Sequence, residues 1–116
     1  MNINKLRDLQ INQDDKIGFD VKFSSLDKKY NQITKDLVGL FGEIGEFSNI
    51  VKKINIKLTN DNYELDIASA EENLREEWVD SFIYLLRISA ILDIDIEAET
   101  LKKMEFNNVR YKKLNR

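Results

Sequence analysis

The chain contains no cysteine, no histidine and no proline, and only four of its 116 residues are glycine. Without cysteine, the chain has no disulfide, thiolate metal site or cysteine nucleophile. Without histidine, Ser-His-Asp catalysis, imidazole metal ligands and the Glu-x-x-His pattern of di-iron bundles are excluded as well. Any chemistry must therefore come from carboxylates, lysines, arginines, hydroxyls and amides, together with the ions that these groups bind.

The sequence also lacks a strong excess of either charge and a long apolar run. Its 18 Lys and Arg against 21 Asp and Glu give a net charge of −3, which offers no general positive field for nucleic acid. No run of about 18 apolar residues exists that would span a membrane. Residues 1–13 do not show the basic-then-apolar order of a signal peptide. We therefore expect one cytoplasmic domain over residues 1–116, with neither nucleic acid nor membrane as a partner.

Helix-compatible spacing dominates the first half of the chain. Apolar residues between 37 and 54 recur every three or four positions, which predicts a helix from about Ser25 to Ile56. Ser24 and Ser25 both offer an N-cap for it. Three glycines (Gly39, Gly42 and Gly45) fall inside it, so the helix is either continuous or kinked there. Each glycine costs about 1 kcal/mol relative to alanine, which indicates a close approach by another helix or a ligand.

Two capping signals mark the helices of the second half. Ser69 and Glu72 match a capping box and predict a helix that begins at Ser69 and runs to about Leu92. Asp95 predicts the N-cap of a last helix over residues 96–114, with acidic residues near its start and basic residues near its end.

The remaining segments complete an all-α expectation. A short helix is expected over residues 3–11, a connection over 12–23 and a loop over 59–62, where polar turn-forming residues gather. The sequence therefore predicts an all-α, four-helix-bundle-like domain.

The predicted helix over residues 72–92 is apolar around almost its whole circumference. Its apolar residues are Trp78, Val79, Phe82, Ile83, Leu85, Leu86, Ile88, Ala90, Ile91 and Leu92. A helix of this kind is usually buried on all sides, and a chain of this length has little material to surround it. We expect part of this surface to contact a second subunit; the alternative is that residues 3–30 cover it within one chain.

The polar residues of this helix share one face. Glu77, Asp80, Tyr84 and Arg87 follow one another at +3, +4 and +3, which is the spacing of neighbours on a helix surface. Charged groups on an otherwise apolar helix need partners, because burying an unpaired charge is costly.

The preceding helix carries a matching pair of acids. Glu43 and Glu46 are three residues apart, as are Glu77 and Asp80. If the two helices are antiparallel, the four carboxylates converge, and they then require a compensating charge. Sites made only of carboxylate oxygens suit hard cations such as Mg²⁺ or Mn²⁺. Taken alone, an acid pair at this spacing is usually an ordinary solvated feature of a helix.

The last predicted helix carries donors for phosphate. Lys103, Asn107 and Arg110 are spaced at +4 and +3 on one face, and such side chains bind phosphate oxygens. The alternative is that Lys103 and Arg110 only complement the helix dipole. Similarly, Trp78 and Tyr84 are more often core residues than ligand-stacking residues. The coincidence of the acid pairs with a cationic face favours a site for a polyphosphate.

These segments together resemble the MazG-like all-α nucleoside triphosphate pyrophosphohydrolases over about residues 30–113. Residues 42–46 (GEIGE) resemble the G-E-x-G-E segment of that family, and residues 76–86 (EEWVDSFIYLL) resemble its E-E-x-x-D helix. Residues 92–97 (LDIDIE) are similar to its L-x-I-D-x-E turn, and residues 103–111 (KMEFNNVRY) to its closing K-x-x-x-N-x-x-R-[YF] segment. The ordered set is more specific than any one motif.

The resemblance implies a MazG-type fold that assembles as a homodimer or homotetramer, with sites near the subunit interfaces. It implies that Mg²⁺, with Mn²⁺ as a substitute, is held by Glu43, Glu46, Glu77 and Asp80, which would form the catalytic centre. The same resemblance implies substrate contacts that comprise phosphate binding by Lys103, Asn107 and Arg110 and base stacking by Tyr84. Residues 1–30 lack the His or Trp with which several members recognise the base, so the resemblance leaves base preference open.

The expected activity is cleavage of a nucleoside triphosphate between its α and β phosphates, which yields a monophosphate and pyrophosphate and serves nucleotide-pool housekeeping. Two alternatives remain. The same fold could act on another nucleotide, such as dUTP, dUDP, dCTP or phosphoribosyl-ATP. The chain could instead be a non-catalytic helical adaptor that assembles into an oligomer.

Overall fold

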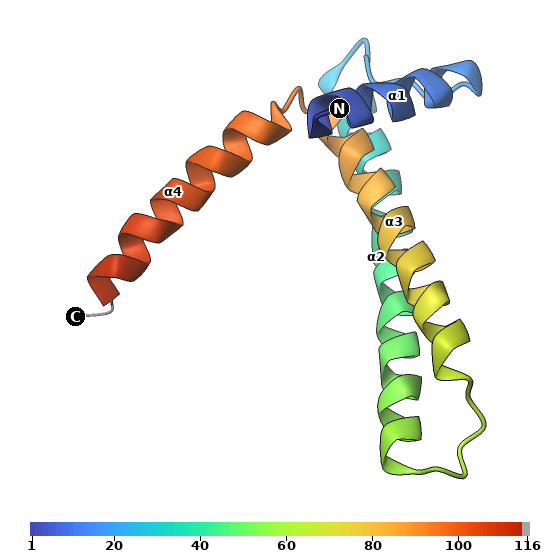
Figure 1. Cartoon of the computed structure of the whole chain (residues 1–116). Helices are drawn as coiled ribbons and strands as arrows, with labels where there is room; N and C mark the ends of the chain where they lie inside the picture. The colour runs from blue at the N-terminus through green and yellow to red at the C-terminus, as the bar shows by residue number, and fades with distance from the viewer. Residues whose placement is uncertain (115–116) are drawn as a thin grey trace.

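The computed structural model describes residues 1–114, and this part of the chain contains four helices and no strand (Figure 1). The helices are α1 (Ile3–Lys16), α2 (Leu26–Thr59), α3 (Ile67–Ile91) and α4 (Ile96–Leu114). The expected all-α class is therefore confirmed. Residues 115–116 of the predicted domain lie outside the described residues.

Helices α2 and α3 form a long antiparallel pair, which is the main contact between elements (Figure 1). Helix α1 lies across the end of this pair where α3 finishes, and α4 extends away from it. Helix α4 packs chiefly on α1. The pair α2–α3 therefore provides the framework on which side chains of distant sequence positions meet.

The predicted start of α2 is confirmed. The Ser25 hydroxyl oxygen accepts a hydrogen bond from the Lys28 backbone N–H at 3.3 Å. The helix runs unbroken through its three glycines and ends at Thr59, three residues beyond the expected Ile56. The Thr59 hydroxyl donates to the carbonyls of Asn55 and Ile56, both at 3.2 Å. These bonds satisfy carbonyl oxygens of the last turn, so Thr59 belongs to the helix and not to the expected loop over residues 59–62.

The prediction of Ser69 as an N-cap is wrong. Helix α3 begins at Ile67, and Asp66 occupies the cap position. The Asp66 carbonyl accepts the first intrahelical bond, from Ala70 N–H at 3.0 Å. Ser69 lies within the first turn, where its hydroxyl donates to the Asp66 carboxylate at 2.7 Å. This bond lowers the pKa of Asp66.

Helix α1 is longer than the expected short helix over residues 3–11, because it continues to Lys16. The expected connection over residues 12–23 is correspondingly shortened. The chain turns after α1 through Gly18, whose φ of +90° suits a residue without a side chain. The Phe19 N–H then donates to the Asp14 carbonyl at 2.9 Å, which holds the start of the connection against α1.

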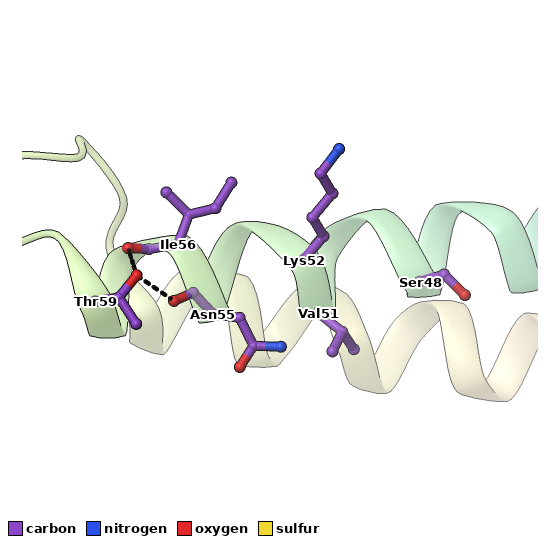
Figure 2. A pocket seen from close by; sticks show the side chains of 6 residues that line it. All are labelled: Ser48, Val51, Lys52, Asn55, Ile56 and Thr59. Atoms are coloured by element: carbon purple, nitrogen blue, oxygen red, sulfur yellow. Dashed lines mark hydrogen bonds between the residues drawn. The ribbon is translucent and has the colours of Figure 1, made fainter.

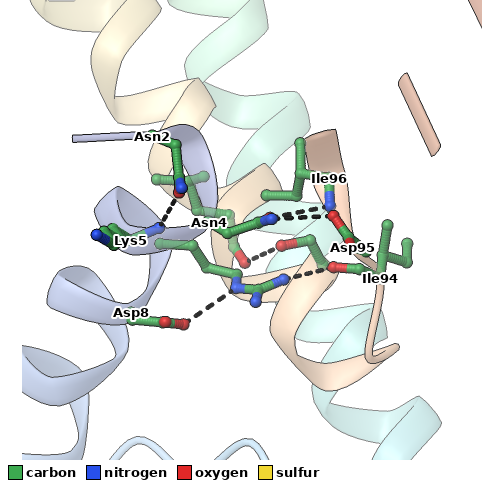
Figure 3. A network of polar contacts seen from close by, with 10 residues as sticks. Asn2, Asn4, Lys5, Asp8, Ile94, Asp95 and Ile96 are labelled. Carbon is green, nitrogen blue, oxygen red and sulfur yellow. Dashed lines mark hydrogen bonds and ion pairs between the residues drawn. The ribbon is translucent and has the colours of Figure 1, made fainter. Parts of the chain in front are cut away.

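Hydrogen bonds between α1 and the start of α4 form the network in Figure 3. The Asp95 carboxylate accepts from the Ala98 N–H at 3.1 Å and from the Asn4 amide at 2.9 Å, and these bonds lower the pKa of Asp95. Asn4 in turn accepts from the Ile96 N–H at 3.0 Å, and Arg7 donates to the Ile94 carbonyl. The predicted Asp95 cap is confirmed, and α1 anchors the first turn of α4.

The core of this structure is small. In the part of the chain that the structure describes, its buried apolar residues are Ile33, Leu40, Ala70, Leu86 and Ile91. Trp78, Val79 and Leu85 are each about half exposed, so residues 3–30 leave part of the apolar surface of α3 uncovered within one chain. Among residues 1–114, none of the helices has the length and apolar character needed to cross a membrane.

Candidate functional site

A line of mostly polar residues runs along one side of the α2–α3 contact, with the same spacing on both helices. The α2 positions advance by +3, +4 and +3 while the α3 positions retreat by the same steps, as expected of antiparallel helices in register. We call this line the seam; its residues are Asp36, Gly39, Glu43 and Glu46 on α2 and Arg87, Tyr84, Asp80 and Glu77 on α3.

Three carboxylates meet in the middle of the seam. Glu43, Glu77 and Asp80 each place one oxygen so that the three atoms lie within 4.8 Å of one another. We call these three residues the acid cluster. Glu43 and Glu77 are half-buried, whereas Asp80 is exposed. The structure thus brings together three of the four acids that the sequence singles out.

The fourth acid, Glu46, also faces Glu77. The facing carboxyl of Glu43, the partial removal of the Glu77 carboxyl from water and the nearby carboxyl of Glu46 together raise the pKa of Glu77 to about 7. Its Oε2 atom is buried and has no hydrogen-bond partner. The Glu77 carboxyl therefore lies where a proton or a cation is favoured.

The acid cluster fits a hard divalent cation by two criteria. All its donors are carboxylate oxygens, which Mg²⁺ and Mn²⁺ prefer. The partnerless Oε2 of Glu77 supplies an acceptor that no protein group satisfies, and a buried acceptor of that kind is costly unless an ion, water or proton reaches it.

Tyr84 explains one of the three glycines of α2. A Cβ atom added at Gly39 would lie 2.4 Å from the Tyr84 ring, closer than any real contact. The expected close approach by another helix is therefore found at Gly39. At Gly42 and Gly45 an added Cβ would meet nothing within 4 Å. Tyr84 consequently packs against α2 backbone beside the acid cluster, one turn along α3.

The seam ends in an ion-pair cluster that the sequence reasoning missed. Arg87 lies with its guanidinium 3.3 Å from Asp36 and 3.4 Å from Asp14, the latter on α1. Both carboxylates are buried. Asp36 could have been found from the sequence, because it precedes Glu43 by seven residues just as Arg87 follows Asp80 by seven. No spacing in the sequence relates Asp14 to these residues in the same way.

The three predicted phosphate-binding residues are not near the acid cluster within one chain. Lys103, Asn107 and Arg110 lie on α4, which diverges from the α2–α3 pair (Figure 1). Lys103 and Arg110 are exposed, and each lies over a neighbouring aromatic ring, those of Phe106 and Tyr111. A site that combines them with the acid cluster therefore requires a second chain.

Among the apolar hollows elsewhere on the α2–α3 pair, two lie well apart along α2. One, of about 270 Å³, lies between the helices on the flank away from Asp80, where the Trp78 and Phe82 rings stack with centroids 5.3 Å apart. The other follows the last turns of α2 (Figure 2), from Ser48 to Thr59. Neither hollow is lined by the acid cluster.

Comparison of the chain with protein-family models, with curated proteins and with solved structures gives no match. The resemblance to the MazG-like family therefore remains a prediction from the sequence motifs.

Proposed function

We propose that the chain is a Mg²⁺-dependent nucleoside triphosphate pyrophosphohydrolase, which cleaves between the α and β phosphates to give a monophosphate and pyrophosphate. The observation that carries the proposal is the acid cluster, in which oxygens of Glu43, Glu77 and Asp80 converge and one Glu77 oxygen is buried without a hydrogen-bond partner. The sequence motifs supply the reaction class, and the geometry supports a cation site at the motif residues.

In this proposal each acid either binds the cation or orients the attacking water. Glu43, Glu77 and Asp80 would hold the cation, and Glu46, which lies outside the acid cluster but near Glu77, would complete the set. Mg²⁺ supplies Lewis-acid polarisation of phosphate and lowers the pKa of water. Glu43 or Glu46 orients the attacking water and accepts its proton. The water oxygen bonds to the α phosphorus while the bond to the bridging oxygen breaks, and pyrophosphate leaves.

We propose further that the protein assembles as a homodimer or homotetramer in which α4 of one chain lies beside the acid cluster of another and completes the substrate site. Lys103, Asn107 and Arg110 would then meet the phosphates opposite the cation and offset the charge of the departing pyrophosphate. Two observations support this arrangement: α4 diverges from its own α2–α3 pair, and apolar side chains of α3 are half exposed.

The proposal is tested by measuring pyrophosphate release from ribonucleoside and deoxynucleoside triphosphates, with Mg²⁺ and with chelator. We expect Mg²⁺-dependent release, and a loss of at least about 100-fold in Glu43→Gln because that side chain holds the cation. Glu105→Gln, which changes the same residue type on α4 away from the cationic face, serves as the matched control. Full turnover in Glu43→Gln contradicts the proposed site.

Mixing inactive chains tests whether sites are shared between subunits. A Glu77→Gln chain and an Arg110→Ala chain are each expected to be inactive, and their mixed oligomers are expected to regain part of the activity, since one site then keeps all its residues. No recovery in demonstrably mixed oligomers contradicts the sharing of α4. Absence of turnover on every nucleotide, without thermal stabilisation by Mg²⁺, would favour the adaptor instead.

A further inference from the structure

The buried ion-pair cluster at the end of the seam takes no part in the proposed reaction. Nη2 of Arg87 lies 3.3 Å from Oδ1 of Asp36 on α2, and its Nε lies 3.4 Å from Oδ2 of Asp14 on α1. Asp36 is 2% exposed and Asp14 is 5% exposed. The guanidinium also lies over the Phe19 ring, 4.4 Å from its centroid. A single cation of α3 thus contacts both other helices of this end.

Stability alone is a poor explanation for such a cluster. The cost of removing the charges from water offsets much of their attraction, and apolar residues of similar volume often serve as well. The best-attested role of a buried polar contact is to fix the register of packed helices. Here the carboxylates are also held in place, because Gln10 donates to Asp14 at 3.0 Å and Gln32 donates to Asp36 at 3.1 Å.

The same register places the acid cluster. Asp36 precedes Glu43 by seven residues and Arg87 follows Asp80 by seven, and seven residues are nearly two helical turns, so each pair shares a face. A slip of α3 along α2 by one turn, about 5.4 Å, would part Arg87 from Asp36 and Asp80 from Glu43 together. The contact at one end therefore constrains the geometry at the other.

The acid cluster cannot hold this register unaided. Its carboxylate oxygens lie within 4.8 Å of one another, and like charges at that distance repel. Along the seam, the attraction between Arg87 and Asp36 is the charge interaction of opposite sign that joins α2 to α3.

We propose that Arg87 is a positioning residue for the acid cluster: its pair with Asp36 sets the register of α2 against α3 and so holds Glu43 opposite Asp80 for a divalent cation. This inference rests on the proposed function, since the cation site is the one assigned to Mg²⁺ there.

Calorimetric titration with Mn²⁺ separates positioning from simple electrostatics. Removal of a positive charge in Arg87→Gln should tighten cation binding if only Coulomb attraction matters. The positioning role predicts the opposite, a weakening of about tenfold or more, the range found when groups that orient metal ligands are removed. The double variant Asp36→Asn/Arg87→Gln leaves the net charge unchanged and is expected to weaken binding by a similar factor.

Asp14→Asn is the matched control, because it removes one negative charge from the same cluster without touching the α2–α3 contact. We expect its Mn²⁺ affinity to stay within about twofold of the unchanged chain, the size of a distant single-charge effect in water. All titrations are made at a temperature where circular dichroism shows each variant folded. Where the double variant does not fold, the triple variant with Asp14→Asn added carries the comparison, because it leaves no buried charge unpaired.

Unchanged or tighter Mn²⁺ binding in the folded double or triple variant overturns the inference and leaves the proposed function standing. Equal weakening in Asp14→Asn also overturns it, since the effect would then not depend on the α2–α3 register. Failure of the unchanged chain to bind Mn²⁺ overturns the proposed function and this inference together.

Discussion

At the scale of single residues, the acid cluster concentrates like charge between α2 and α3. Glu77 shows the consequence most clearly, because Glu43 and Glu46 face it and one of its oxygens is buried without a partner. The rise in the pKa of Glu77 to about 7 means that the folded chain favours the protonated carboxyl more than the unfolded chain does.

This shift predicts a pH dependence of the chain without metal. The contribution of Glu77 to stability is full below its unfolded pKa of 4.5 and is lost as the pH rises through about 7. In EDTA, the urea midpoint of the unchanged chain should therefore fall between pH 5.5 and 8. Glu77→Gln should show a smaller fall over the same window, since it stays neutral. Identical pH profiles for the two chains would contradict the shift.

Gly39 is the position in α2 at which a larger side chain should lower the free energy of unfolding. Gly39→Ala places a methyl group 2.4 Å from the Tyr84 ring, and overpacking of this kind costs about 1–3 kcal/mol. Gly45→Ala has open space around it and is expected to stabilise α2 by up to about 1 kcal/mol. Urea unfolding measures both; a stabilised Gly39→Ala chain would show that Tyr84 does not pack there.

At the scale of helices, the junction of α1 with α4 decides how α4 is held. Helix α4 packs chiefly on α1, and its first turn depends on the Asp95 carboxylate, which bonds to Ala98 N–H and to Asn4 (Figure 3). Because few other contacts hold α4, the cap carries an unusual share of its local stability.

Asp95→Ala is expected to destabilise α4 by about 1 kcal/mol, the usual cost of losing a helix cap. Hydrogen exchange should show faster exchange at α4 amides while those in the centre of α2 and α3 keep their protection, since α4 can open locally. Asp95→Asn retains an acceptor at the cap and should exchange close to the unchanged rate. Equal effects of the two substitutions would argue against capping.

The starts of helices were predictable where a capping side chain alone determines the first helical residue. Ser25 and Asp95 cap the predicted helices because their side chains lie at the start of an apolar helical pattern. The prediction for Ser69 failed because the helix begins two residues earlier, at Ile67, and the Ser69 hydroxyl donates to the Asp66 carboxylate instead of capping. The ends of α1 and α2 depend on tertiary contacts and backbone hydrogen bonds that no spacing rule encodes.

The candidate site was predictable to a similar extent. The spacing of Glu43, Glu77 and Asp80 was sufficient because antiparallel packing turns equal steps into facing pairs. The contact of Arg87 with Asp14 was not predictable, because it depends on how α1 crosses the end of the pair.

At the scale of the whole molecule, the exposed apolar surface of α3 and the diverging α4 favour assembly. Leu85→Glu places a charge in the apolar hollow beside Trp78 and should convert the proposed oligomer to monomers without loss of helix, because the charge cannot be buried. Light scattering after gel filtration measures the mass. Leu58→Glu, at an exposed position near the end of α2, should leave the assembly intact. A monomeric unchanged chain would contradict the proposed assembly.

Hydrolysis in ¹⁸O-labelled water, followed by ³¹P NMR, identifies the phosphorus atom that water attacks. With Mg²⁺ and a nucleoside triphosphate, we expect a nucleoside monophosphate that carries the label and pyrophosphate that does not, because water attacks the α phosphorus in the proposed reaction. Label in pyrophosphate, release of orthophosphate or an unchanged triphosphate would contradict it.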